Sequence, residues 1–510
     1  MRKFLKFLSQ RIVIVTFLIF LQIMWFVGMF LKVTSYSQYI TAAFKILSIL
    51  VVIYIMNRSD NPSVKLGWIV VILLFPLFGG LLYLTIGGKQ PISHLRRKLE
   101  PMIEESARHL KADPKIEQEL KEKDGSTASQ IYYLEHQSGF PAYKDSKVDY
   151  YPSGEDCFKV MAEELRKAKE YIYLEYFIIE EGIMWNTILD ILEEKVKEGV
   201  DVRVMYDDVG CIFNLPSHYA DFLRKKGIKC IVFNRYIPIF STVFNNRDHR
   251  KILVIDGDVA FTGGINFADE YINEKMRFGH WKDTGFMLRG EAVAGFTAMF
   301  LEMWNVNDEH IEDCGEYIQA SKKYSVSTDG FVIPFGDTPL DEVYVGKRAY
   351  INNLNNASEY TYIMTPYLVI DDEMYECMKY AAQRGVDVKI IMPHIPDKKY
   401  AFYLARTYYK ELLKAGIEIY EYTPGFVHAK MSISDGKKAI VGTVNHDYRS
   451  LYLHYECAAY MLNVPAVMDI ERDFKDTLEL SQKITLEDVK HFNIFTKLLG
   501  HIIRLVAPLL

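Results

Sequence analysis

Hydrophobic residues follow one pattern in the first ninety positions and another afterwards. Three long apolar stretches come first, at residues 12–31, 40–56 and 66–86, and the first is twenty residues long. Twenty apolar residues suffice for a helix to cross a bilayer. The second stretch contains Lys45, which is costly at mid-membrane, so a buried core helix is its alternative. The pattern predicts an N-terminal membrane anchor of two to three transmembrane helices over residues 1–88.

Basic residues flank this anchor on both sides. One group precedes the first stretch and another follows the third: Arg2, Lys3, Lys6, Arg11 and Lys89, Arg96, Arg97, Lys98. The positive-inside rule places both groups on the cytoplasmic side. Two spans, or one re-entrant segment, would satisfy it, whereas three full spans would separate them. We expect a multi-pass protein of the cell membrane with the bulk of the chain in the cytoplasm.

The pattern changes to a highly charged stretch at 89–130, which predicts a helical, solvated linker. From residue 131, helix-period and β-rich segments alternate. Residues 158–169 and 186–197 suit helices, and each is followed by a strand-like segment, at 171–177 and 200–206. Such alternation predicts an α/β sandwich with a parallel or mixed sheet.

The globular part also repeats itself. Residues 168–175 resemble 357–364, and residues 198–205 resemble 384–391. Similar spacing between the paired stretches indicates a duplicated domain with small insertions and deletions, not a short-period solenoid. We therefore predict two α/β domains, at 131–320 and at 321–510 with the C-terminal tail. The apolar end, 492–510, suits either the membrane interface or closure of the core.

The two predicted domains carry the same polar motif. In the first, His249 is followed by Lys251, Asp256, Gly263 and Asn266. His and Lys two residues apart on a strand point to the same side. The four residues after Lys251 are apolar and suit a buried strand, and Asp256 with the next glycine predicts a tight turn.

The second copy keeps every spacing. His428 is followed by Lys430, Asp435, Gly442 and Asn445 at the same intervals. One such match in a long chain has a chance probability on the order of a few per cent, but two with glycine and asparagine in register leave little room for coincidence. Two imidazoles, two ammonium groups and two amides suit a phosphodiester, which needs a nucleophile, an acid for the leaving group and a clamp for its oxygens.

Composition narrows the partners. The net charge of −6 disfavours a nucleic-acid partner, which usually needs a basic surface. The six cysteines are scattered without a CxxC pair or zinc spacing, which favours a reduced compartment. Neither a metal site nor a cofactor is predicted.

The doubled motif resembles that of the phospholipase D superfamily, and more narrowly that of the bacterial cardiolipin synthases within it. The resemblance covers nearly the whole chain, and the stretches that carry it are 61–83, 247–251, 262–271, 445–451 and 507–510. It departs from that pattern at Asp248, where asparagine is expected, at Cys211, where serine is usual, and at His454-Tyr455-Glu456, where Asn-Phe-Glu is more familiar. No histidine or lysine of the motif is lost.

This resemblance implies two phospholipase D-type α/β domains packed with pseudo-two-fold symmetry. It also implies phosphatidyl transfer between two phosphatidylglycerol molecules through a phosphohistidine, giving cardiolipin and glycerol. His249 is expected as nucleophile and His428 as acid and base, although the symmetry makes the reverse easy. A pKa near 7 would let one imidazole be neutral and the other protonated.

The remaining motif residues are expected to support this chemistry. Lys251 and Lys430, with Asn266 and Asn445, would hold the phosphoryl oxygens. Asp283 and Glu456 would each orient one imidazole, although Asp283 could instead lie in a surface turn. Asp256 and Asp435 complete the catalytic motif but are expected to fix local structure more than to perform chemistry.

Two other function classes stay open at this point. A phospholipase D-type hydrolase would use the same intermediate and let water attack it. A non-catalytic membrane scaffold is disfavoured by the intact motif residues.

Phosphatidylethanolamine could replace one phosphatidylglycerol as donor. The sequence leaves the oligomeric state open, although one chain holds both half-sites.

Overall fold

A computed structural model describes residues 37–58, 61–75, 92–123, 125–235, 246–308 and 310–509, with a few shorter stretches between 20 and 84. It divides into two compact units. The first comprises residues 1–94, 236–245 and 501–510, and the second comprises 95–235 and 246–500. Both copies of the motif belong to the second unit.

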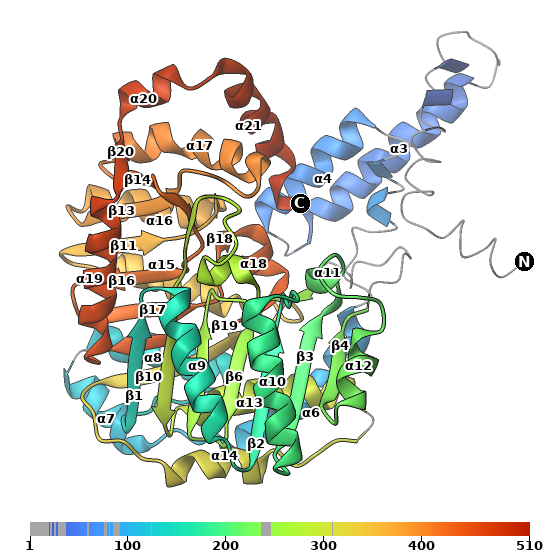
Figure 1. The fold of residues 1–510 in the computed structure, drawn as a ribbon. Helices are drawn as coiled ribbons and strands as arrows, with labels where there is room; N and C mark the ends of the chain where they lie inside the picture. The colour runs from blue at the N-terminus through green and yellow to red at the C-terminus, as the bar shows by residue number, and fades with distance from the viewer. Residues whose placement is uncertain are drawn as a thin grey trace, which may run out of the picture. The chain divides into compact units, whose positions relative to one another are not determined.

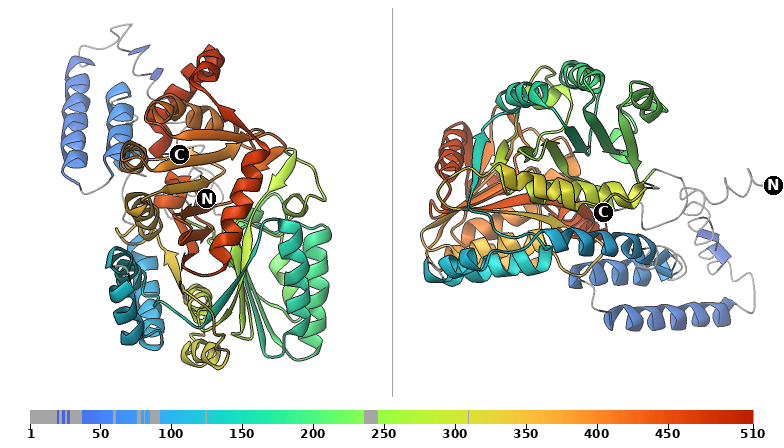
Figure 2. Two further views of the ribbon diagram at one scale, coloured as in Figure 1. Left: turned by 90° about the vertical axis from the view of Figure 1, so that its left-hand side faces the viewer. Right: turned by 90° about the horizontal axis from the view of Figure 1, so that it is seen from below.

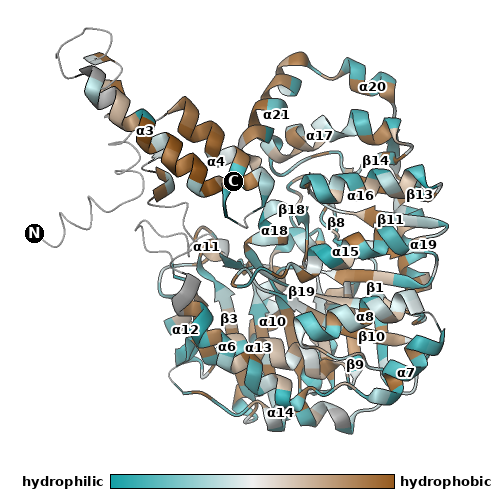
Figure 3. Ribbon diagram, turned by 180° about the vertical axis from the view of Figure 1, so that it is seen from behind, coloured by the Kyte–Doolittle hydropathy of each residue, from teal (hydrophilic) through white to brown (hydrophobic). Residues whose placement is uncertain are grey.

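The first unit is built on two helices, α3 (Ser37–Met56) and α4 (Pro62–Leu74), both rich in hydrophobic residues (Figure 3). Val51 and Ile55 of α3, Ile72 of α4, and Tyr83 beyond them form one buried cluster. None of the helices in the described part of the chain combines the length and the apolar character that a membrane crossing needs. The predicted stretch at 66–86 is not one helix, because α4 ends at Leu74, ahead of Pro76. Most of the stretch at 12–31 lies outside the described residues.

The first half of the second unit is a seven-stranded mixed sheet in the order β1-β9-β7-β6-β2-β3-β4. Its strands are β1 (Ser146–Tyr151), β2 (Tyr171–Tyr176), β3 (Asp201–Asp207), β4 (Lys229–Phe233), β6 (Lys251–Ile255), β7 (Val259–Gly263) and β9 (Gly285–Gly290). β2, β3 and β4 are parallel, and the others are antiparallel to their neighbours. The predicted α/β layering with a mixed sheet is confirmed.

Helices cover both faces of this sheet (Figures 1 and 2). α9 (Gly154–Lys167) and α10 (Ile183–Lys197) lie on one face, close to the predicted positions, and α12 (Tyr219–Lys225) precedes β4. On the other face lies α13 (Val293–Asn307), which packs between β2 and β6 of this sheet and a strand of the second half. Every residue from Val293 to Val306 is buried, so α13 belongs to the core shared by the two halves.

The second half repeats the strand order. Its larger sheet runs β10-β19-β17-β16-β11-β13-β14-β20, which matches the first sheet strand for strand with β20 added at the edge. The strands are β10 (Phe331–Asp337), β11 (Tyr360–Met364), β13 (Asp387–Pro393), β14 (Glu418–Tyr422), β16 (Met431–Ser434), β17 (Lys438–Gly442), β19 (His454–Leu462) and β20 (Ser481–Ile484). Its helices include α15 (Val345–Asn356), α16 (Asp372–Gln383), α17 (Lys399–Lys414), α18 (Tyr448–Tyr452) and α19 (Ala466–Glu479).

The pairing registers support the duplication directly. Tyr171 pairs with Asp201 in the parallel ladder of β2 and β3, and Tyr360 pairs with Asp387 in that of β11 and β13. These residues occupy equivalent places in the two sequence repeats. The predicted duplication therefore holds in strand order and in register, while pseudo-two-fold symmetry remains a prediction.

The charged stretch before the first sheet is helical, as predicted, and its helices each bury part of their surface. α6 (Ile92–His109), α7 (Pro114–Lys123) and α8 (Gly125–Ser138) follow one another, and α8 packs against α15 and β10. Leu120, Ile131 and Leu134 are buried, because apolar residues at helical spacing form one face among the charges.

Short strands join the two halves immediately before each motif. β5 (Arg247–Asp248) pairs in parallel with the start of β19, and β15 (Gly425–Val427) pairs in parallel with β8 (His280–Lys282). Each motif therefore begins where the chain is hydrogen-bonded to the opposite half. This exchange brings the two motifs into one site.

Each motif also ends in the predicted turn. Asp256 and Gly257 both have positive φ, of 53° and 69°, as do Asp435 and Gly436, of 53° and 63°. Two consecutive residues with positive φ form the hairpin turn whose twist matches antiparallel strands. The Asp256 carboxylate accepts hydrogen bonds from the backbone N–H groups of residues 169–171, at 2.8–2.9 Å. Asp435 does the same with residues 358–360, so both carboxylates tie the hairpin to the start of the neighbouring strand.

We predict that replacing Asp435 with alanine destabilises the fold. Three backbone donors lose a charged acceptor, a cost of about 1–3 kcal/mol in free energy of unfolding. Burial would raise the pKa of Asp435, but the backbone donors at Tyr360, Ser358 and Glu359 outweigh it and lower the pKa. A lowered pKa stabilises the fold above the unfolded-state value, about 3.9, and that stabilisation is lost as pH falls through the folded-state value.

Thermal unfolding midpoints from pH 7 down to pH 3 check this. The difference in unfolding midpoint between wild type and Asp435→Ala should be largest at pH 7 and should decrease below pH about 4. Asp190→Ala, at an exposed position of α10, is the matched control and should change stability by less than about 0.5 kcal/mol. A gap that is absent at pH 7 would contradict the assigned role.

Candidate active site

His249 lies immediately before β6, with its side chain turned toward the second half of the chain. Its Nδ1 is 2.9 Å and 3.0 Å from the two carboxylate oxygens of Glu456, and its backbone N–H donates to the carbonyl of Tyr455 at 3.0 Å. Phe177 meets the ring edge-to-face at 5.0 Å between centroids. A carboxylate can only accept, so Nδ1 carries the proton and Nε2 keeps a free lone pair.

His428 has the corresponding surroundings in the opposite direction. Its Nδ1 lies 2.7 Å from Oδ2 of Asp283, and its backbone N–H donates to the carbonyl of Lys282 at 2.7 Å. The rings of Tyr271 and Trp281 contact the imidazole at centroid distances of 5.4 and 5.2 Å. Each imidazole is therefore oriented by a carboxylate from the other half of the chain.

Both carboxylates are themselves fixed. The hydroxyl of Thr443 donates to Oε2 of Glu456, and the backbone N–H of Thr284 donates to Oδ1 of Asp283 at 2.8 Å. Asp283 and Glu456 are completely buried. Burial rules out the surface turn that the sequence left open for Asp283.

The two motif lysines are buried beside their histidines. The ammonium of Lys251 donates to the carbonyl of His249 at 2.5 Å, and Lys430 donates to that of His428. Burial lowers the pKa of Lys251 to about 8 and that of Lys430 to about 7, against the pull of nearby carboxylates. Two ammonium groups in one buried site are suited to an anion.

The pKa values of both imidazoles lie below the expected value near 7. Burial, followed by the charges of Lys251 and Lys430, lowers the pKa of His249 well below 6.5. Burial and Lys430 lower the pKa of His428 to about 4, although Asp283 opposes them. Both rings are therefore neutral in the free site. A bound anion would raise both pKa values, because it favours the protonated form.

The two asparagines of the motif have different surroundings. The amide of Asn266 is occupied: its oxygen accepts from the N–H of Ile178 at 3.0 Å, and its nitrogen donates to the hydroxyl of Tyr271 at 2.7 Å. The amide oxygen of Asn445 is buried and has no hydrogen-bond partner among the described residues. Asn266 thus positions Tyr271, whose ring meets that of His428 edge-to-face, while the Asn445 amide oxygen is left without a partner among the described residues.

The departures from the family pattern fall around the first motif. Asp248 accepts from the backbone N–H of Arg250 at 3.2 Å and faces Glu175, so its carboxylate serves the buried charge cluster behind the motif. The Cys211 thiol is buried and accepts from the N–H of Ile179 at 3.2 Å. His454 lies beside His249, with the ring centroids 5.4 Å apart.

Sequence reasoning missed the side chains that hold these groups in place, chiefly Tyr271 and Thr443. Tyr271 was noted only as part of the family stretch, and no spacing rule pairs a threonine with a carboxylate thirteen residues later. Such contacts depend on how the strands pack, which a local pattern does not encode.

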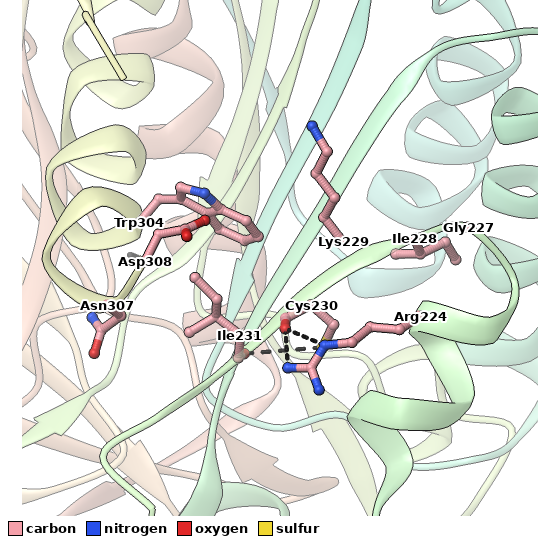
Figure 4. A pocket seen from close by; sticks show the side chains of 9 residues that line it. All are labelled: Arg224, Gly227, Ile228, Lys229, Cys230, Ile231, Trp304, Asn307 and Asp308. Atoms are coloured by element: carbon pink, nitrogen blue, oxygen red, sulfur yellow. Dashed lines mark hydrogen bonds between the residues drawn. The ribbon is translucent and has the colours of Figure 1, made fainter. Parts of the chain in front are cut away.

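A separate pocket of about 450 Å³ lies beside β4, lined by residues that include Arg224, Cys230 and Trp304 (Figure 4). The guanidinium of Arg224 donates twice to the carbonyl of Cys230, at 3.1 and 2.6 Å. None of the motif residues lines this pocket. This pocket is therefore distinct from the site formed by the two motifs.

The sequence matches the family model described as "Cardiolipin synthase, PLD-like domain" at residues 161–304 and 350–478, together more than half of the chain. The chain belongs to this phospholipase D-like cardiolipin synthase family. The resemblance carried by the doubled motif is thereby confirmed. A second family model, "Phospholipase_D-nuclease N-terminal", matches residues 46–88.

Relatives extend this family match over most of the chain. It is 31% identical to a cardiolipin synthase of Halalkalibacterium halodurans, over 99% of this chain and 100% of the relative. It is 50% identical to an uncharacterized protein of Streptococcus mutans, over 90% of this chain and 99% of the relative. The crystal structure of phosphatidylserine synthase from Haemophilus influenzae superposes with a TM-score of 0.56 at 14% identity, covering 71% of this chain and 95% of that structure. This last likeness concerns the fold alone.

We predict that Glu456→Gln and Asp283→Asn each slow turnover by roughly 10²–10⁴-fold. Either amide keeps the shape of the carboxylate but removes the charge that fixes the imidazole tautomer and stabilises its protonated form. Initial rates with purified protein in lipid–detergent micelles measure the loss.

Asp371→Asn is the matched control. Asp371 is an equally buried carboxylate, but it caps α16 and pairs with Lys347, and asparagine preserves the cap. The control should show no comparable loss. Equal losses in all three variants would mean that the carboxylates matter for folding and not for orienting the imidazoles.

Proposed function

We propose that this protein is a cardiolipin synthase that joins two phosphatidylglycerol molecules, releasing glycerol. The observation that carries the proposal is the crossed pair of imidazole–carboxylate contacts, His249 with Glu456 and His428 with Asp283. One imidazole can act as nucleophile and the other as acid and base, and two buried ammonium groups lie beside them. This arrangement suits a phosphodiester transfer that proceeds in two steps. No part of the chemistry requires a cofactor.

In the first step, His249 is the nucleophile. Its Nδ1–H is held by Glu456, so the lone pair on Nε2 attacks the phosphorus of the donor lipid. The bond from phosphorus to the oxygen of the headgroup glycerol breaks, and protonated His428 gives its proton to that departing oxygen. Lys251 and Lys430 neutralise charge that builds on the non-bridging oxygens. A phosphatidyl group is left on His249.

The donor itself helps to prepare the acid. His428 is neutral in the free site, with a pKa lowered to about 4, but an anionic phosphodiester would raise that pKa. Asp283 accepts from Nδ1 of His428 and stabilises the imidazolium that results. Protonation of the acid thus follows binding of the substrate.

The second step runs the same exchange in reverse. Neutral His428 takes the proton from the free hydroxyl of a second phosphatidylglycerol, whose oxygen attacks the phosphorus. The bond from phosphorus to Nε2 of His249 breaks, cardiolipin leaves, and both imidazoles return to their starting forms. A hydrolase would admit water at this point instead. The family favours the lipid hydroxyl as acceptor.

We also place the protein at the bacterial cell membrane, with residues 1–88 as anchor and the catalytic part on the cytoplasmic side. The match of 46–88 to the N-terminal family model supports the anchor. So do the exposed apolar side chains of α3, among them Ile46, Leu50 and Ile53. Near the C-terminus, α21 (Ile494–Val506) exposes apolar residues at helical spacing, which suits the membrane interface: Ile494, Phe495, Leu498, Leu499, Ile502 and Leu505.

We predict that purified protein supplied with phosphatidylglycerol alone yields cardiolipin and glycerol in equal amounts. Lipid products are separated by chromatography, and glycerol is measured enzymatically. Phosphatidic acid with glycerol would show that water is the acceptor and would overturn the proposal. Turnover that needs added phosphatidylethanolamine would change the donor and keep the transfer mechanism.

The roles of the two histidines can be separated with a phosphatidyl ester of p-nitrophenol. This leaving group departs without a proton, so His428→Ala should still release about one equivalent of p-nitrophenolate per site. His249→Ala should release none, because it lacks the nucleophile. Stopped-flow absorbance measures the burst. The reverse pattern would assign the nucleophile to His428.

A further inference from the structure

His454, a departure from the family pattern, is a buried histidine without a structural explanation. It begins β19, and only 9% of its side chain is exposed. Neither ring nitrogen has a hydrogen-bond partner among the described residues. A buried polar group without a partner costs free energy that a core position would normally avoid. The side chain faces Glu456, with its Nδ1 3.7 Å from Oε1.

His454 completes a set of three possible metal ligands with His249 and Glu456. One ligand atom from each residue lies within 4.8 Å of the other two. Oε1 of Glu456 is 2.9 Å from Nδ1 of His249 and 3.7 Å from Nδ1 of His454. Ligand atoms about 2.0–2.1 Å from a tetrahedral zinc ion lie roughly 3.3 Å apart. The two Glu456 separations bracket that value, and the ligand atoms of the two histidines lie within 4.8 Å of each other.

We propose that His249, His454 and Glu456 form an inhibitory binding site for a zinc-like divalent transition-metal ion. Two imidazoles and one carboxylate match the donor types and number of a three-ligand zinc site. Imidazole ligands favour transition metals over magnesium or calcium, which prefer oxygen. This inference rests on the proposed function in one respect, since inhibition presumes that His249 is the nucleophile.

The inhibition follows from the position of one proton. In the active form, Nδ1 of His249 carries the proton and donates to Glu456, which leaves the Nε2 lone pair free. A metal ion bound at Nδ1 occupies the lone pair there, and the neutral ring then carries its proton on Nε2. The nucleophilic lone pair is thereby lost. The metal also takes the carboxylate that oriented the ring.

The surrounding charges set a limit on this site. Lys251 and Lys430 both lower the pKa of His249, and their ammonium groups would likewise oppose a bound cation. We therefore expect reversible binding, weaker than at structural zinc sites, whose ligands are not accompanied by two buried ammonium groups. An anionic substrate that compensates the lysines would reduce this opposition to the metal ion.

A second cluster on the described surface provides a matched control. His109 on α6 lies 3.4 Å from Glu105 and 3.8 Å from Asp313, measured from its Nε2 to a carboxylate oxygen. Asp313 is largely exposed. An exposed cluster of this kind can bind added metal weakly, so it must be distinguished from the buried set.

The direct test is a titration of the full-length protein in detergent micelles with Co²⁺, followed by its visible absorption. Wild type and His109→Asn should show the same saturable tetrahedral spectrum. His454→Asn, which replaces the imidazole with a smaller amide, should bind at least about tenfold more weakly. Binding by His454→Asn as tight as in wild type would overturn the site, and loss of the spectrum in His109→Asn would move it to the surface cluster.

The functional test measures Zn²⁺ inhibition of phosphatidylglycerol turnover, with each variant compared with its own rate in chelator. The zinc concentration for half-inhibition should rise at least about tenfold in His454→Asn and not in His109→Asn. Cobalt binding through His454 without inhibition would overturn the inhibitory role. Absence of any turnover in chelator would instead count against the proposed function, and the cobalt titration would still decide the metal site.

Discussion

The contact on which the rest of this structure depends is the hydrogen bond between an imidazole on one half of the chain and a carboxylate on the other. His249 needs Glu456, and His428 needs Asp283. Neither half therefore contains a complete catalytic group. The short parallel pairings of β5 with β19 and of β8 with β15 fix the backbone on both sides of each contact. Duplication thus produced two halves whose functional side chains are complete only together.

Close backbone packing makes these contacts possible and explains the glycine of the motif. A Cβ at Gly263 would lie 2.4 Å from the carbonyl oxygen of Thr284, and one at Gly442 would lie 2.4 Å from that of Cys457. These carbonyls belong to the residues that directly follow Asp283 and Glu456. The glycines therefore let the strand that bears each carboxylate lie against the hairpin of the motif. Gly263 also has a φ of 149°, which few other residues adopt.

The sequence predicted what is local and missed what is not. Strand period, turn residues and repeat spacing were sufficient for β6, for its turn at Asp256 and for the duplicated sheet. The partners of the histidines are 145 and 207 residues away in the chain, so only family resemblance suggested Asp283 and Glu456. The sequence predicted helices at 89–130 but not the packing of α8 against α15 and β10, because that packing joins segments far apart in the chain. His454 was noted as a departure, but its burial depends on the packing of β19.

The electrostatics of the site connect binding with chemistry. Two lysines and two histidines share a buried volume with two carboxylates, and the pKa values of all four basic groups are lowered. The free site therefore holds both imidazoles neutral, which keeps a nucleophile available and leaves the acid unprotonated. A phosphodiester supplies the missing negative charge and raises those pKa values together. The charge of the substrate, more than any single side chain, would then set the protonation state in which transfer proceeds.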